Sequence, residues 1–218
     1  MTLKIVNEQV EKYMRGLLTQ YDEPVLLEME ALAAEKNFPI INRHVGVTVE
    51  ILARAIGARR IFELGSGYGY SAYWFARAAG PGAEVHCTDG DAENAKQAEQ
   101  FLSRAGLWDR ISFHVGDAVT AFNEVGGDWD IVYNDIDKHG YPAAWEAARD
   151  RVKIGGMYIC DNVLWSGRVA EDKPKDDIRE GWTEAIKQHN AMIAADERYE
   201  SSILPIRDGV MVALRVAD

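Results

Sequence analysis

The sequence predicts an α/β fold built on a mostly parallel sheet with helices on both faces, and three observations predict it. Short apolar runs typical of strands alternate with helix-like segments from about residue 59 onward. The first run ends in closely spaced glycines, Gly65, Gly67 and Gly69, before a helix-like segment. The last two runs are separated only by Arg207 and Asp208. This connection is too short for a parallel crossover, so the two runs must form an antiparallel hairpin.

The part of the chain before the first strand is expected to be helical. Apolar residues recur there at helical spacing, for example Val10, Met14 and Leu17, which predicts two or three helices. A chain of 218 residues with 47% hydrophobic content is long enough to bury one sizeable core but short for two. We therefore expect a single domain over residues 1–218, with N-terminal helices over 1–57 and the sheet over 58–218.

The remaining elements follow in order along the chain. The expected strands lie within residues 59–64, 83–89, 110–118, 129–135, 155–162, 199–206 and 209–216. The expected helices lie near residues 71–80, 91–106, 118–124, 141–152 and 176–195. Helices of this length between strands imply right-handed crossovers and a sheet that is covered on both faces. The polar stretch 166–181 is expected to be a loop, either a lid over a substrate or an ordinary surface connection.

Composition excludes several classes of protein. The 35 acidic and 24 basic side chains leave a net charge of -11, which repels phosphate backbones and anionic membrane surfaces, so we expect no nucleic-acid or membrane partner. No stretch approaches the roughly 18 apolar residues of a membrane span, and the first residues lack the pattern of a signal peptide. Cys87 and Cys160 sit in strand-like runs without metal-binding spacing, which indicates reduced core residues. The sequence thus predicts a cytoplasmic protein.

The first two strand ends indicate an adenosine-like ligand. In open α/β sheets, ligands gather outside the carboxyl ends of the strands. Glu63 can accept hydrogen bonds there, although Tyr70 stands where a pyrophosphate-binding GxGxxG loop needs its third glycine. Asp89, 20 residues beyond Gly69, can accept both hydroxyls of a ribose; the alternative is a surface aspartate. The third strand end, at residues 116–118, could border the adenine ring.

The fourth and fifth strand ends carry a cluster of polar groups. Asp135 follows one run, and Asp161 and Asn162 follow the next; if these strands are neighbours, three oxygen donors converge. Such a set suits Mg²⁺, Mn²⁺ or Ca²⁺ rather than zinc. The alternative is that these acids only cap turns or helices. Lys138 is a candidate base, because a nearby cation lowers a lysine pKa, or else it is a solvated charge; His139 is the alternative base.

Five segments together resemble the cation-dependent, S-adenosylmethionine-dependent O-methyltransferases of the caffeoyl-CoA type, which are related to catechol O-methyltransferase. The segments are FELGSGYGYS, CTDGDAEN, IVYNDIDKHGY, ICDNVLWSG and LPIRDGVMVALR. The resemblance implies a class I methyltransferase Rossmann-like fold, with a seven-stranded sheet whose last strand is antiparallel. It also implies residue roles: Glu63, Gly65, Ser66, Ser71, Asp89, Ala118 and Asp137 at the cofactor, Asp135, Asp161 and Asn162 at the metal, and Lys138 as the base.

The activity that the resemblance implies is methylation of one of two vicinal hydroxyls on a catechol-like or hydroxycinnamoyl small molecule. The cofactors would be S-adenosylmethionine and a divalent cation, Mg²⁺ or else Mn²⁺ or Ca²⁺, and the family's dimers suggest a homodimer. The chain departs from the family pattern at Val47, Asn134 and Ser166. Two other functions stay open: an NAD-dependent oxidoreductase, which predicts a parallel sixth strand, and a non-catalytic S-adenosylmethionine-binding protein, which leaves Lys138 without a role.

Overall fold

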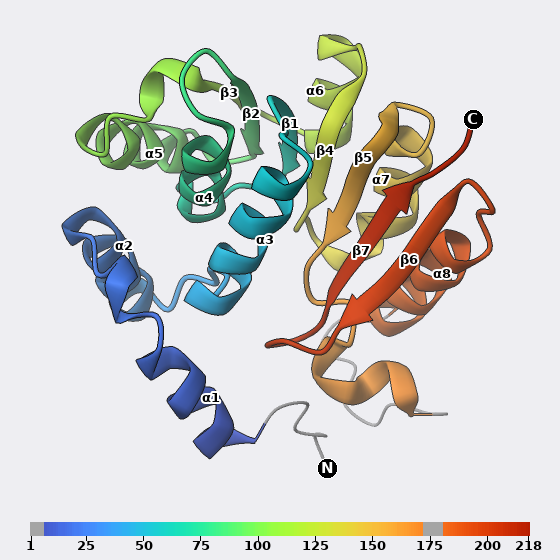
Figure 1. Ribbon diagram of the computed structural model, residues 1–218, viewed down its shortest axis with the longest axis horizontal. Helices are drawn as coiled ribbons and strands as arrows, with labels where there is room; N and C mark the ends of the chain where they lie inside the picture. The colour runs from blue at the N-terminus through green and yellow to red at the C-terminus, as the bar shows by residue number, and fades with distance from the viewer. Residues whose placement is uncertain (1–6, 172–180) are drawn as a thin grey trace.

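The computed structural model describes residues 7–171 and 181–218, and these form one seven-stranded sheet (Figure 1). The strands are β1 Arg60–Leu64, β2 Glu84–Asp89, β3 Ile111–Val115, β4 Trp129–Asn134, β5 Val152–Cys160, β6 Tyr199–Leu204 and β7 Val210–Arg215. Their order across the sheet is β3-β2-β1-β4-β5-β7-β6. Pairs are parallel up to β5, and β7 runs antiparallel to both of its neighbours. The predicted sheet with a closing antiparallel hairpin is therefore confirmed.

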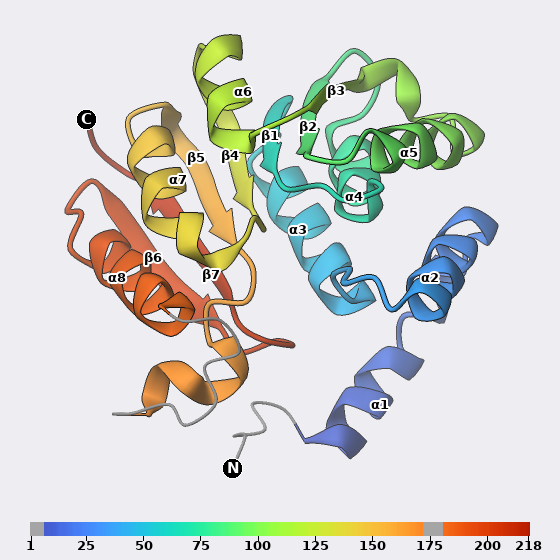
Figure 2. The ribbon, with the colours of Figure 1, turned by 180° about the vertical axis from the view of Figure 1, so that it is seen from behind.

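Helices cover both faces of this sheet. They are α1 Glu8–Gly16, α2 Pro24–Lys36, α3 Arg43–Ala55, α4 Tyr70–Ala79, α5 Ala92–Arg104, α6 Ala118–Val125, α7 Tyr141–Ala148 and α8 Trp182–Ala194. In Figure 1, α3 and α4 lie in front of the sheet, and Figure 2 shows α6, α7 and α8 on the opposite face. Residues 172–180, which include most of the predicted loop and the expected start of α8, lie outside the described residues. No helix of the described residues has the length and apolar character needed to cross a membrane.

The core forms two layers because alternate strand residues point to opposite faces. Ile61 and Tyr133 pack in the layer with α3 and α4, whereas Phe62 and Val132 pack in the layer with α6, α7 and α8. All four side chains are fully buried. The two cysteines are free and buried, as predicted.

Short polar side chains fix where several helices begin. Asn42 accepts a hydrogen bond from the Val45 amide at 3.0 Å at the start of α3. Asp117 does the same for the Thr120 amide of α6 at 2.8 Å, which satisfies a donor that the helix itself leaves free. Since α6 starts at the end of β3, this cap also places the first turn of the helix at the carboxyl edge of the sheet.

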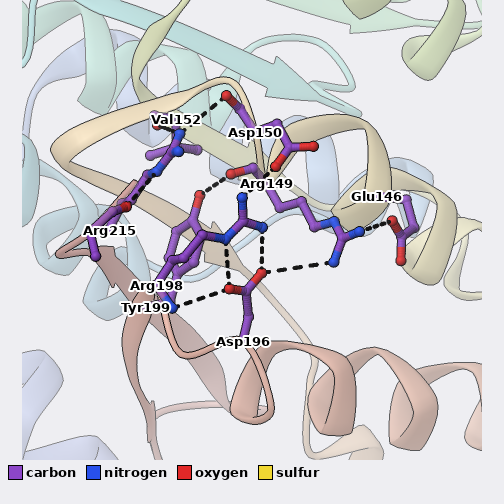
Figure 3. Close-up of polar contacts among 9 residues, drawn as sticks. Glu146, Arg149, Asp150, Val152, Asp196, Arg198, Tyr199 and Arg215 are labelled. Atoms are coloured by element: carbon purple, nitrogen blue, oxygen red, sulfur yellow. Dashed lines mark hydrogen bonds and ion pairs between the residues drawn. The ribbon is translucent and has the colours of Figure 1, made fainter.

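An ion-pair network fastens the closing hairpin at the opposite edge (Figure 3). The Asp196 carboxylate accepts hydrogen bonds from Arg198 Nε at 2.8 Å and Nη2 at 2.7 Å. Arg198 Nη1 also reaches Asp150 at 2.5 Å, and the Tyr199 hydroxyl donates to the Arg149 carbonyl at 2.6 Å. These contacts join the start of β6 to the segment between α7 and β5, far from the carboxyl ends of the parallel strands.

Candidate active site

The sheet order places a crevice where β1 and β4 lie side by side. The chain proceeds from β1 to β2 and β3 on one side, whereas β4 and β5 lie on the other, and such a switch point opens a ligand site outside the carboxyl ends. A cavity of about 930 Å³ is found there. The predicted site residues that line it are Gly65, Ser66, Ser71, Asp89, Ala118, Asp135, Asp137, Lys138 and Asn162. Glu63 and Asp161, the other two, are fully buried at the ends of β1 and β5.

The glycine loop is held against the ends of both neighbouring strands. Gly65 has φ +84°, and a Cβ at this position would lie 2.8 Å from the carbonyl oxygen of Asp135, so only glycine fits. On the other side, the Gly65 amide donates to Thr88 Oγ1 at 3.0 Å and the Ser66 amide donates to the Thr88 carbonyl at 2.7 Å. The sequence did not single out Thr88, since a threonine in a strand is ordinary.

Glu63 is a fully buried acid beside this loop. Neither carboxylate oxygen has a hydrogen bond of normal geometry among the described residues. Burial raises the pKa of Glu63 to about 7, although the nearby hydroxyls of Ser71 and Ser66 act to lower it. A buried acceptor without a donor indicates that a ligand's donor groups complete the site.

Asp89 combines a local role with a place in the cavity wall. Its Oδ1 accepts from the Asp91 amide at 2.8 Å and from Asn94 Nδ2 at 3.0 Å, so it stabilises the turn into α5. The alternative expectation for Asp89 was a surface aspartate, and these bonds give the side chain a structural role in the turn. Its side chain still lines the cavity, where a ribose hydroxyl can approach.

The two acids at the ends of β4 and β5 interact, as the sequence predicted for neighbouring strands. Asn134 pairs with Cys160, and the Asp161 amide donates to the Asn134 carbonyl at 3.1 Å, so Asp135 and Asp161 follow on adjacent strands. Burial raises the pKa of Asp161, and the charge of Asp135 raises it further. Asp161 Oδ1 is buried and has no hydrogen-bond partner of normal geometry among the described residues.

Lys138 is not a solvated charge, because only 7% of it is exposed. Its Nζ lies 3.0 Å from Asp135 Oδ1 and 3.2 Å from the carbonyl oxygen of Ile136. The ring of Tyr141 lies 5.0 Å from the same nitrogen. His139, the alternative base, lines the cavity but is exposed, with its ring 6.2 Å from that of Trp182.

The donor set fits a hard divalent cation in its chemistry. Within residues 7–171 and 181–218, no group of three or more His, Cys, Asp or Glu side chains is placed to hold a metal ion, so the candidate ligands are two carboxylates and the amide of Asn162. Asn162 has φ +58°, a conformation that asparagine tolerates better than most residues, and it lines the cavity. The unpartnered Asp161 Oδ1 is the oxygen that such an ion would satisfy.

The sequence missed a second cation at this site, Arg207. Arg207 Nη1 donates to Asp161 Oδ2 at 2.6 Å, and its Nη2 donates to the carbonyl of Ile40 at 2.9 Å. In the sequence, Arg207 stands out only as one of the two residues that connect the last two predicted strands. The feature that could have identified it is a charged residue inside the LPIRDG turn. The segment 38–41 and Trp182, which also line the cavity, carried no local signal.

The three departures from the family pattern have identifiable surroundings. Val47 is buried in the core on α3. Asn134 is fully buried, and its Nδ2 lies 3.3 Å from Cys160 Sγ, which ties the ends of β4 and β5 together. The Ser166 amide donates to Asp208 Oδ1, so its backbone rather than its side chain fixes the hairpin turn.

Comparison with known proteins agrees with this geometry. A family model described as O-methyltransferase matches residues 18–216. Catechol O-methyltransferase from Niastella koreensis is 28% identical over 95% of this chain and 96% of its own length. Caffeoyl-CoA O-methyltransferase from Petroselinum crispum is 30% identical over 79% of this chain and 75% of its own. The O-methyltransferase from Bacillus cereus, solved in complex with SAH, has a TM-score of 0.80 at 25% identity, covering 92% of this chain and 96% of that one. The chain therefore belongs to the O-methyltransferase family and is an S-adenosylmethionine-dependent O-methyltransferase.

Proposed function

We propose that this enzyme methylates one of two vicinal hydroxyls on a catechol-like or hydroxycinnamoyl small molecule, with the help of a divalent cation. The observation that carries the proposal is the buried Lys138 beside the paired acids Asp135 and Asp161 at one wall of the cavity. Two relatives are named for catechol and caffeoyl-CoA, which supports a phenolic acceptor.

The cofactor is proposed to bind at the ends of β1 to β4. Gly65, Ser66, Ser71 and Ala118 would provide close backbone and hydroxyl contacts, since all four line the cavity. Three acids, Glu63, Asp89 and Asp137, would face the amine, ribose and sulfonium groups of the cofactor. A carboxylate-rich pocket complements a positively charged sulfonium, whereas a phosphate-binding loop would not.

The metal ligands are proposed to be Asp135, Asp161 and Asn162. A bound Mg²⁺, Mn²⁺ or Ca²⁺ would supply Lewis-acid polarisation of the acceptor's two vicinal oxygens. Lys138 then acts as the general base, because its Nζ is buried at the cavity wall and can take the proton of the attacking hydroxyl. The cavity walls hold the two reactants together, and such positioning can remove about 7 to 11 kcal/mol of barrier.

The aromatic end of the cavity supports a planar acceptor. The rings of Trp165 and Trp182 lie 5.7 Å apart, and both line the cavity. A volume of about 930 Å³ is sufficient for a cofactor and a small phenol together.

The test is a screen of labelled S-adenosylmethionine against catechols, flavonoids and hydroxycinnamoyl thioesters, with and without a chelator. We expect methylation of a vicinal diol that the chelator abolishes. Asp161→Ala should abolish metal-stimulated transfer, whereas the exposed Asp128→Ala should not change it. Full activity of Asp161→Ala in the presence of chelator would reject the metal-assisted mechanism. Absence of turnover with every vicinal diol would reject the acceptor class.

The remaining expectations about partners stay proposals. The apolar side chains of Val10 and Tyr13 on α1 and of Leu17, which directly follows α1, are 50%, 69% and 56% exposed, which supports a homodimer that covers them. The net charge of -11 supports the expectation of no nucleic-acid partner and is compatible with the proposed cytoplasmic location. The oxidoreductase alternative required a parallel strand at the sixth position, where β7 is antiparallel. Sedimentation at several concentrations would test the dimer.

A further inference from the structure

We propose that Arg207 is a built-in counter-ion of Asp161 that competes with the divalent cation for the charge of this carboxylate and so lowers the affinity of the site for the cation. This inference rests on the proposed metal site and adds a residue that sets its affinity. It predicts that the enzyme binds its cation more weakly than the same ligands would without Arg207.

The contact that carries the inference is direct. Arg207 Nη1 lies 2.6 Å from Asp161 Oδ2, and the Asp161 side chain is fully buried. Arg207 is largely buried as well, with 28% of its side chain exposed. An ion pair in such surroundings is weakly screened, so the guanidinium at Oδ2 would repel a divalent cation that binds Oδ1 of the same carboxylate.

Each of the two acids already has a cation as its partner. Asp135 pairs with Lys138 at 3.0 Å, and Asp161 pairs with Arg207. Without Arg207, a divalent ion would meet a site that carries one more net negative charge. Because Coulomb interactions are strong where water is excluded, this difference should appear in the dissociation constant of the ion.

The backbone of Arg207 indicates that its side chain holds an unfavourable conformation in place. Its φ is +49°, in the left-handed region that glycine adopts more readily than arginine. The turn around it is fastened separately, because the Leu164 amide donates to the Asp208 carbonyl at 2.9 Å and the Val163 amide donates to that of Gly209 at 3.1 Å. Replacing Arg207 by glycine therefore removes the guanidinium charge and the strain of the positive φ, and it leaves these two backbone hydrogen bonds in place.

Arg207 also links the site to the cavity wall. Its Nη2 donates to the Ile40 carbonyl at 2.9 Å, and residues 38–41 line the cavity. A cation that binds Asp161 and weakens its ion pair with Arg207 would therefore also affect the bond between Arg207 and Ile40. The metal and the N-terminal wall of the cavity are coupled through one side chain.

The experiment measures Mn²⁺ binding to the purified full chain by electron paramagnetic resonance, without any substrate or turnover. We expect Arg207→Gly to bind Mn²⁺ tighter by about tenfold or more, since it frees a buried carboxylate. Arg207→Lys, which keeps the charge, should stay closer to wild type than to Arg207→Gly. The matched control is Arg168→Ala, which removes an arginine whose Nη1 donates to the carbonyl of Trp165 at 3.4 Å; it should change the affinity by less than about threefold.

Thermal unfolding provides a second readout. Mn²⁺ should raise the thermal unfolding midpoint of Arg207→Gly more than that of wild type, because in this variant the ion is the cation that pairs with Asp161. If Arg207→Gly does not fold, Arg207→Asn replaces it, since asparagine also tolerates a positive φ and carries no charge. Equal Mn²⁺ affinities of wild type and the uncharged variant would overturn the competition while leaving the metal site in place. No Mn²⁺ binding by any of the proteins would overturn the metal site itself, and the inference with it.

Discussion

Glu63→Gln should make the protein more stable at neutral and alkaline pH while weakening cofactor binding. The side chain is fully buried, and burial raises the pKa of its carboxyl from 4.5 to about 7. Between these two values the unfolded chain has released the proton that the folded chain still holds. The folded state therefore loses stability as the pH rises through this window, and the loss persists above it. Glutamine is neutral at every pH and does not lose stability in this way.

The size of the effect follows from the two pKa values. They differ by about 2.5 units, and one unit corresponds to about 1.4 kcal/mol, so wild type should lose about 3 kcal/mol relative to Glu63→Gln by about pH 8. At about pH 4, where Glu63 is protonated in both states, the two proteins should be nearly equally stable. Asp161 titrates in both proteins, so its contribution cancels in the difference.

Urea unfolding at a series of pH values from about 4 to about 8 measures this difference directly. The exposed Glu99→Gln on α5 is the matched control and should follow wild type throughout. Calorimetric titration with SAH should show that Glu63→Gln binds at least about tenfold more weakly, because a neutral amide replaces the proposed acceptor. Parallel stability profiles for wild type and Glu63→Gln would refute the reasoning from burial.

Three further substitutions test other parts of the site. Lys138→Met should lower kcat by about 10² to 10⁴ while SAH affinity measured by calorimetry stays the same, and an unchanged kcat would exclude Lys138 as the base. Gly65→Ala forces a Cβ to 2.8 Å from the Asp135 carbonyl at φ +84°, so thermal denaturation should show a loss of about 1–3 kcal/mol together with weaker SAH binding. Arg198→Ala removes two bonds to Asp196, whose side chain is 8% exposed, and should lower the free energy of unfolding by about 1–3 kcal/mol in urea titration (Figure 3). Because that network lies at the other edge of the sheet, a fall in kcat per folded molecule would contradict this assignment.

The sheet and its closing hairpin could be predicted because their signals are local. Short apolar runs between helix-like segments identified the strands, and a connection of two residues between the last runs excluded a parallel crossover. The positions of Asp135 and Asp161 followed from the same logic, since the carboxyl ends of adjacent parallel strands meet at one edge. Local sequence was sufficient wherever a side chain's place depended only on its own strand.

The place of Arg207 and of the segment 38–41 in the site could not be predicted, because their contacts join residues that lie far apart in the sequence. Arg207 reaches a carboxylate 46 residues earlier in the chain and a carbonyl 167 residues earlier. Both contacts depend on where the hairpin turn lies after the whole sheet has formed. Asn134 was unexplained for a similar reason: its amide lies 3.3 Å from Cys160 Sγ on the next strand, and that pairing exists only once β4 and β5 are adjacent.

The buried carboxylates lower the stability of the folded state, and cationic side chains at the site offset part of this cost. Burial raises the pKa of the Tyr133 hydroxyl, and the charges of Asp161, Asp135 and Glu63 raise it further, so all three acids converge near one side chain. Lys138 and Arg207 neutralise Asp135 and Asp161, whereas Glu63 has no cation among its described neighbours. A ligand with a positive charge and hydrogen-bond donors would supply what Glu63 lacks, and part of its binding free energy would come from relieving this acid. Stability lost in the free protein is then recovered on binding, which is why the same substitution at Glu63 should stabilise the free enzyme and weaken its complex.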